Sequence, residues 1–267
     1  SLFALVRPEG AWLGLDPEHY EHVRATFLLV AVWFSLFSLP LLMVTPDRRR
    51  GPRRSPTEAV RRGMRQLAGS LRRIRDYGHI VRFLAARMLY IDGLATIFAF
   101  GGVYAAGTFD MNEEQVLAFG IALNVSAGLG AALFAGLDDR LGSKRTILLA
   151  LVGLVVTSTT ILGVESRGLF WIVGVVLGIF VGPAQAASRS YLSRAAPEEL
   201  RTEMFGLYAL SGKATAFVGP LLVGWITAWA GSQRIGMSVI VVLLLAGGLL
   251  LLTVPRADEL DRRRAPD

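Results

Sequence analysis

The chain has 267 residues, of which 53% are hydrophobic and only 18% are charged. Soluble domains carry about 25% charged residues, so this composition excludes a disordered chain and argues against an ordinary soluble enzyme. With no cysteine and three histidines, we expect no disulfide framework, no metal site and no other cofactor. The net charge of +7 comes from arginines between apolar blocks, which is typical of membrane loops and not of a nucleic-acid partner.

Long apolar segments dominate the chain. A membrane-spanning helix needs about 20 predominantly apolar residues, and seven segments meet this length. Residues 1–6 have the character of the end of one further span. Because the apolar runs are continuous and do not alternate, they predict an all-α polytopic membrane bundle and exclude a strand barrel. The predicted spans are residues 24–45, 80–107, 115–137, 146–164, 169–192, 204–230 and 235–254.

Loop charges predict the orientation of these spans. Residues 46–79 contain eleven arginines, and the loops 138–145 and 193–203 and the C-terminal tail are also basic. The alternate loops, residues 108–114, 165–168 and 231–234, each carry one arginine at most. Since basic loops stay inside, we expect the C-terminus to be cytoplasmic and the protein to lie in the cell membrane, plasma or inner.

The order of the segments predicts four regions. Residues 1–45 form the end of an N-terminal half, with the stub of its fifth span, a periplasmic loop and its sixth span. Residues 46–79 form a basic cytoplasmic linker, in which residues 57–76 have the pattern of an amphipathic surface helix. Residues 80–254 form a C-terminal six-helix bundle, and residues 255–267 a cytoplasmic tail. This order is typical of a 6+6 transporter cut partway through its first half.

The loop at residues 135–145 reads Ala-Gly-Leu-Asp-Asp-Arg-Leu-Gly-Ser-Lys-Arg. It resembles the cytoplasmic signature of the major facilitator superfamily, from which it departs at Ala135. Gly142 permits a tight turn, and Asp139 either pairs with a basic residue or caps the next helix. A plain basic loop with a turn glycine is the alternative. The resemblance implies a cytoplasmic gate formed by the matching residues and a nearby acid: Asp139, Arg140, Gly142, Lys144, Arg145 and Glu203.

Three further strings carry a closer resemblance, at residues 182–190, 203–208 and 211–221. Together they resemble the vacuole-effluxer-like branch of the superfamily, also called the unknown major facilitator family. Its fungal members are autophagy-associated vacuolar amino-acid effluxers. The resemblance covers essentially the whole chain, as spans six to twelve of twelve, and implies transport of a small solute, with amino acids as the best candidate.

Charged side chains inside the spans are the candidate substrate or coupling groups, because each costs roughly 2.5–3.5 kcal/mol on insertion scales. Asp92 lies near mid-depth and is either a proton-coupling carboxylate or a structural partner of Lys213 or Arg87. Lys213 is either a ligand for a substrate carboxylate or a counter-ion for Asp92. Tyr208 and Ser211 offer hydrogen bonds on a neighbouring face.

A second candidate group lies on the span at residues 169–192. Gln185 and Arg189 are four residues apart and share a helix face, so they are able to bind an anionic group. The alternative is a gate in which Arg189 pairs with Glu203 or Asp139. The Gly-Pro pairs at residues 182–183 and 219–220 predict that two adjacent spans are interrupted or kinked, and the alternative is that membrane helices tolerate proline.

These observations predict a secondary active or facilitative transporter that moves small solutes through the lipid bilayer by alternating access, with proton coupling at Asp92 as a candidate. No nucleotide-binding loop is present, so we expect no ATP drive, and no constellation indicates an enzyme. The alternative is a non-transporting membrane sensor or scaffold whose arginine-rich linker binds anionic lipid or a partner. The oligomeric state stays open.

Overall fold

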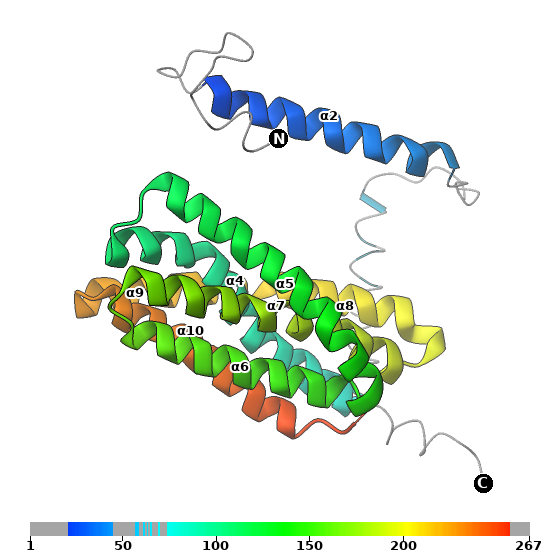
Figure 1. The fold of residues 1–267 in the computed structure, drawn as a ribbon. Coiled ribbons are helices and arrows are strands. Elements are labelled where there is room, and N and C mark those ends of the chain that lie inside the picture. The colour runs from blue at the N-terminus through cyan, green and yellow to red at the C-terminus, as the bar shows by residue number, and fades with distance from the viewer. Residues whose placement is uncertain are drawn as a thin grey trace. The chain divides into compact units, whose positions relative to one another are not determined.

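The computed structural model describes residues 21–44, with side chains from residue 27 onward, a few positions between 57 and 69, and residues 74–256. The chain divides into two compact units, residues 1–62 and residues 63–267. All regular elements of the described residues are helices (Figure 1). Seven of the helical segments among them are long and apolar enough to cross a membrane. The predicted stub at residues 1–6, most of the predicted surface helix at 57–76 and most of the tail lie outside the described residues.

The first unit contains one described helix, α2 (Glu21–Val44), at the place of the predicted span 24–45. Its side chains from Phe27 to Val44 are exposed almost throughout, and most of them are large and apolar. Trp33 and Phe37 lie one turn apart, with ring centroids 4.5 Å from each other. An apolar helix that is exposed on all sides of its own unit is suited to a lipid environment.

The second unit holds the remaining spans, which lie side by side with alternating chain direction (Figure 1). Short connections join them, as expected for antiparallel neighbouring helices. Asn112 closes the first of these turns with a capping box to Gln115, and Gly142 makes the second with a φ of 83°. Within residues 74–256 the helices are α4 (Gly78–Phe109), α5 (Glu113–Leu141), α6 (Ser143–Gly163), α7 (Arg167–Ala195), α8 (Arg201–Ala214), α9 (Val218–Ala230) and α10 (Gln233–Leu252), and the 3₁₀ turn η1 (Glu198–Leu200) precedes α8.

Two close helix pairs build the core of the second unit. Helix α4 packs along α10, and α5 packs along α7, while α6 lies between α7 and α10. The core contains large fully buried side chains such as Phe83, Tyr90, Tyr191 and Leu244. Ring contacts, for example Phe83 with Tyr191 at 4.4 Å between centroids, tie α4 to α7. Because α4 packs along α10, the first and last spans of this unit are direct neighbours.

Glycines set the distance between α5 and α7. A Cβ atom added at Gly130 would overlap the backbone carbonyl of Ile179, and one added at Gly182 would overlap the carbonyl of Ala127. In a membrane, small residues at a four-residue spacing let helix backbones approach closely. Gly174, Gly178 and Gly182 have this spacing along α7. The α5–α7 pair is consequently held by backbone proximity and by van der Waals contact.

The predicted interruptions of two spans have different outcomes. Helix α7 continues through Pro183 without a break, which agrees with the alternative that a membrane helix tolerates proline. The predicted span 204–230 is interrupted, but at residues 215–217 and not at the Gly-Pro pair. Pro220 lies in the first turn of α9, where its missing N–H costs no helical hydrogen bond. The span thus consists of two half-helices, α8 and α9.

Arginine and lysine side chains bind the carboxyl ends of several helices. Arg167 donates to the carbonyls of Phe109 and Asp110 at 3.0 Å each, and Arg234 donates to those of Leu162 and Val164 at 3.3 and 2.9 Å. At the other end of the bundle, Lys144 donates to the carbonyl of Leu252 at 2.9 Å. Cations at these positions satisfy free carbonyls and complement the negative end of the helix dipole.

Candidate functional site

The interruption between α8 and α9 faces two charged residues of α4, Arg87 and Asp92. Both side chains are buried, at 7% and 2% exposure. Arg87 contacts α8 and Asp92 contacts α9, so a single continuous helix holds both halves of the interrupted span. Two glycines let α8 and α9 approach α4 closely. A Cβ atom at Gly212 would meet the Arg87 guanidinium, and one at Gly219 would meet Thr96.

Asp92 accepts a hydrogen bond from the backbone N–H of Gly219, with 2.8 Å between N and Oδ2. Its second oxygen, Oδ1, is buried and has no hydrogen-bond partner among residues 74–256. Neither Lys213 nor Arg87 forms an ion pair with it in this part of the chain. The structural alternative for Asp92 therefore needs correction: its partner is the amino end of a half-helix, which carries a partial positive charge.

Arg87 donates to the carbonyl of Tyr208 at 3.0 Å and to the hydroxyl of Ser211 at 3.2 Å. Its guanidinium also stacks on the Tyr208 ring, 3.5 Å from the ring centroid. A desolvated cation on an aromatic face is favourable by about 2 kcal/mol. Tyr208 and Ser211 are buried and bound to Arg87, so the structure places them inside the helix packing and not on an exposed face.

Lys213 and Arg189 are exposed, in contrast to the buried Arg87 and Asp92. Neither makes a hydrogen bond or ion pair with another residue of 74–256. Lys213 lies at the middle of the interrupted span Glu198–Ala230. Gln185, one turn before Arg189, is half-buried. The two cations thus lie on helix surfaces of the second unit at positions where a charge needs water or a ligand.

The loop at residues 138–145 is bound to α7 by Arg194. Its guanidinium lies 3.3 Å from the carboxylate of Asp139 and 3.7 Å from that of Asp138, and it donates to Ser143 Oγ at 3.2 Å. The open choice for Asp139 is thereby resolved in favour of a basic partner, since no side chain caps α6. That partner is Arg194, so the pairing of Arg189 with Asp139 that the gate alternative allowed does not occur.

The other residues of the predicted gate take separate places. Gly142 makes the turn and Lys144 reaches the end of α10, as described above. Arg140 and Arg145 are exposed, and Glu203 is half-buried in the first turn of α8. A cavity of about 230 Å³ lies beside the loop, between α5, α6 and α7, lined by Asp138, Asp139, Thr146, Ser190 and Arg194 among others. The loop at residues 138–145 is thus attached to α7 by ion pairs, and its role as a gate stays a prediction.

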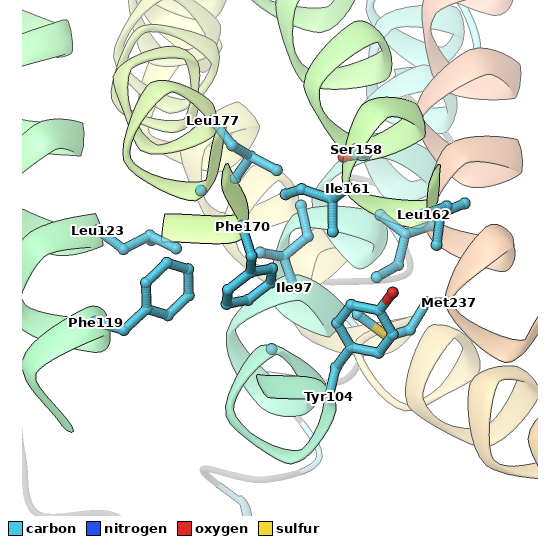
Figure 2. Close-up of a pocket in the computed structure, with 13 residues that line it drawn as sticks. Ile97, Tyr104, Phe119, Leu123, Ser158, Ile161, Leu162, Phe170, Leu177 and Met237 are labelled. Carbon is cyan, nitrogen blue, oxygen red and sulfur yellow. The ribbon is translucent and has the colours of Figure 1, made fainter. Parts of the chain in front are cut away.

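An apolar cavity lies between α4, α5, α6, α7 and α10 (Figure 2). Its walls are apolar side chains such as Phe119, Phe170 and Met237, with the hydroxyls of Tyr104 and Ser158 as polar groups. Both hydroxyls are buried and have no hydrogen-bond partner among the described residues. At about 50 Å³ the cavity has room for a few water molecules, which is far below the several hundred Å³ of a typical ligand pocket.

Sequence reasoning missed Arg194 and the role of the Gly219 amide. Arg194 stands out in the sequence only as one more loop arginine, because pairing between distant helices leaves no periodic signal. The first-turn position of Pro220 is a usable signal, since proline favours the start of a helix over its interior. It would have placed the interruption before residue 218.

Comparison with known proteins gives the family. The family model described as "Vacuole effluxer Atg22 like" matches residues 11–261. The chain belongs to this Atg22-like vacuole effluxer family. Among curated proteins, the chain is 25% identical over 238 residues to the uncharacterized MFS-type transporter YxiO of Bacillus subtilis, covering 89% of this chain and 55% of that protein. It is 24% identical over 265 residues to autophagy-related protein 22 of Coccidioides immitis, covering 89% of this chain and 44% of that protein.

Membership of the Atg22-like family confirms the resemblance stated from the motifs at residues 135–145 and 182–221. It also confirms the all-α bundle of the major facilitator type and the expectation that the protein is not an enzyme. The chain spans about half the length of the curated relatives it matches. The roles of the individual site residues remain predictions.

Proposed function

We propose that this Atg22-like chain is the C-terminal portion of a secondary active or facilitative transporter. It moves small solutes across the cell membrane by alternating access, with amino acids as the first candidates and with its C-terminus in the cytoplasm. Family membership supports membrane transport, and the resemblance of residues 182–221 to the effluxer branch supports the substrate class. The alternating basic loops support the orientation.

The observation that carries the proposal is the exposed ammonium of Lys213. It lies at the middle of a membrane span and has no partner among residues 74–256. The carboxyl end of α8, whose last turn contains Lys213, compensates only part of this charge. A charge at that depth is costly in hydrocarbon, so the surrounding space must hold water or an anionic group. A carboxylate arriving from an aqueous pathway would supply the missing partner. Lys213 is therefore our candidate ligand for a substrate carboxylate.

The polar strip on α7 supports the same reading. Arg189 is exposed at the carboxyl-terminal part of α7, and Gln185 is half-buried one turn before it. A guanidinium and an amide one turn apart on a membrane helix are costly in lipid, so we expect them to border a hydrated pathway. Arg189 offers such a pathway a second anion-binding group.

Reconstituted transport tests the proposal. The complete protein is placed in vesicles, and exchange of a labelled amino-acid mixture is measured. Lys213→Ala is compared with Arg201→Ala, which removes an exposed cation from the first turn of the same helix. We expect Lys213→Ala to reduce exchange by at least about tenfold, as for loss of one charge-assisted contact, and Arg201→Ala to retain it.

The outcomes separate the site from the function. Unreduced exchange by Lys213→Ala would show that Lys213 is not the substrate ligand. If the unaltered protein exchanges no amino acid and no other small solute, transport itself is refuted, and a membrane sensor or scaffold becomes the better explanation. Asp92→Asn addresses coupling in the same vesicles: a coupling carboxylate is needed for uphill accumulation and not for exchange.

A further inference from the structure

The interruption at residues 215–217 is held from both sides by α4, and this arrangement has a consequence for how the span moves. The inference rests on the proposed transport function, because it concerns the conformational change that such transport requires. Helix α4 contacts the end of α8 through Arg87 and the start of α9 through Asp92. The two contacts differ in chemistry: the contact to α9 is made by a carboxylate, which is able to take up a proton, and the contact to α8 is made by a guanidinium.

The amino end of α9 depends on Asp92 for its cap. No side chain of its own N-cap residue, Phe217, binds the first turn. The N–H of Val218 donates to the carbonyl of Thr215 at 2.8 Å, and Pro220 has no N–H to satisfy. The Gly219 N–H is left, and its acceptor is the carboxylate of Asp92. An aspartate from a neighbouring helix thus acts as the N-cap that the local sequence lacks.

The contact on the other side of the interruption has a permanent charge. Arg87 donates to Tyr208 and Ser211 and stacks on the Tyr208 ring. A guanidinium stays protonated at any physiological pH. Thr215 adds a weaker link, with its hydroxyl 3.4 Å from the carbonyl of Met88. Helix α8 is therefore attached to α4 by contacts that pH leaves unchanged.

Asp92 has one oxygen free for a proton. Oδ1 is buried without a hydrogen-bond partner among residues 74–256, whereas Oδ2 is occupied by Gly219. A buried ionised carboxylate needs compensating charge, and the half-helix supplies only part of it.

No ionisable group on the helices that pack against α4 forms an ion pair with Asp92 within residues 74–256. Helix α9 has none. Helix α10 has only Arg234, which binds the end of α6. Helix α5 has its ionisable residues in its first turn and its last residues. The remaining groups on α4, α8 and α7 are His79, Arg82, Arg87, Tyr90, Tyr104, Arg201, Glu203, Tyr208, Lys213, Arg167, Arg189, Tyr191 and Arg194.

Of the interior groups on α4, α7 and α8, Tyr104 lies twelve residues beyond Asp92 and lines the cavity of Figure 2. Arg87 and Tyr208 bind each other, and Tyr90 shares a hydrogen bond of 2.7 Å with Ser188. Lys213 is exposed, and no ion pair joins it to Asp92 within residues 74–256. In the described part of the chain, a proton on Oδ1 is thus the simplest means of neutralising this carboxylate.

We propose that Asp92 is a proton-operated latch on α9. Ionised Asp92 holds the start of α9 against α4. When Oδ1 takes a proton from water, the carboxylate becomes a neutral carboxylic acid, and the hydrogen bond from Gly219 loses its charge assistance. Charge-assisted hydrogen bonds are roughly twice as strong as neutral ones, and the attraction to the helix dipole disappears as well. The start of α9 then separates from α4 while Arg87 retains α8.

Hydrogen–deuterium exchange on the complete protein tests the latch without requiring transport. The measured quantity is the protection of the backbone amides in residues 215–222, corrected for the intrinsic effect of pH. Residues 240–247 of α10 serve as an internal reference. We expect protection of residues 215–222 to fall by about tenfold from about pH 8 to about pH 5, with the reference segment unchanged.

Three variants make the test specific. Asp92→Asn keeps the size and an acceptor oxygen but removes the charge, so we expect low protection of residues 215–222 at both pH values. Asp110→Asn removes an exposed carboxylate at the end of the same helix, and we expect wild-type behaviour. Arg87→Met loosens α8, and the pH response of residues 215–222 should persist.

The latch is refuted if Asp92→Asn protects residues 215–222 as well as the unaltered protein does at high pH. It is also refuted if protection in the unaltered protein does not change with pH, a result that stands even if the variants fail to fold. A pH-dependent loss of protection in a protein that moves no solute would refute the transport function alone. Uphill, pH-driven accumulation with constant protection would refute the latch alone.

Discussion

The contact between α5 and α7 at Gly130 makes a quantitative prediction about stability. A methyl group at this position would overlap the carbonyl of Ile179, which belongs to the backbone and cannot be relieved by a change of rotamer. Pro183 lacks the N–H that would normally bind this carbonyl one turn later. Because the freed carbonyl faces α5, Gly130→Ala must push the two helices apart along the glycine-lined contact.

The size of the effect follows from two opposing contributions. Overpacking costs typically about 1–3 kcal/mol, whereas replacing glycine by alanine in a helix gains about 1 kcal/mol. Gly128, two residues earlier on α5, has no atom within 4 Å of an added Cβ, so Gly128→Ala receives the gain without the cost. The difference between the two variants isolates the overlap, at about 2 kcal/mol, or a melting temperature lower by about 2–4 °C for a protein twice the length of this chain.

Thermal denaturation of the detergent-purified complete protein, followed by size-exclusion chromatography of heated samples, measures this difference. The midpoint for Gly130→Ala should lie several degrees below that for Gly128→Ala. Equal midpoints for the two variants would mean that α5 and α7 do not approach each other at Ile179. Gly182→Ala, which meets the carbonyl of Ala127, provides a second substitution with the same expectation.

Three further predictions concern stability in the same assay. Gly142→Ala should lower the melting temperature, because a φ of 83° costs a side-chain-bearing residue about 1–3 kcal/mol; no change relative to Gly136→Ala, where space is open, would contradict this. Arg194→Gln should lower the free energy of unfolding by about 1 kcal/mol, because it leaves the buried Asp138 without its cation. Arg201→Gln, which removes an exposed arginine, should have no effect. Equal effects of the two variants would argue against the pairing of Arg194 with Asp138 and Asp139. Tyr104→Phe should leave stability unchanged or raise it, because the buried hydroxyl has no protein partner in the described residues; a loss of more than about 1 kcal/mol would instead indicate a bound water or solute in the cavity of Figure 2.

Much of the fold could be predicted from the sequence because hydropathy acts locally. Each predicted span from 24–45 to 235–254 is helical at its place, with ends that differ by a few residues, although the span 204–230 is divided into α8 and α9. The turn at Gly142 was also predictable, since the conformation it adopts favours glycine. These features depend on short stretches of chain and on the thickness of the bilayer.

The candidate site was predictable only in part. The depth of Asp92 follows from its position in an apolar run. Its partner is a backbone N–H, which every residue except proline has, so the sequence does not indicate which residue provides it. The interruption of the span at 204–230 was expected at its proline, whereas a first-turn proline marks where the second half-helix starts. Helix α7 passes through Pro183 intact because tertiary packing against α5 outweighs the lost hydrogen bond.

The separation in sequence between α4 and its partners has a consequence for synthesis. The hydrogen bonds of Arg87 with Tyr208 and of Asp92 with Gly219 join residues 121 and 127 positions apart. At roughly 5–20 residues per second, a ribosome needs about 6–25 s to make that stretch. During this interval α4 has left the ribosome with two ionisable groups whose partners do not yet exist. Membrane insertion of α4 is then expected to wait at the translocon for α8 and α9, and a nascent chain ending before residue 208 should remain there or be degraded.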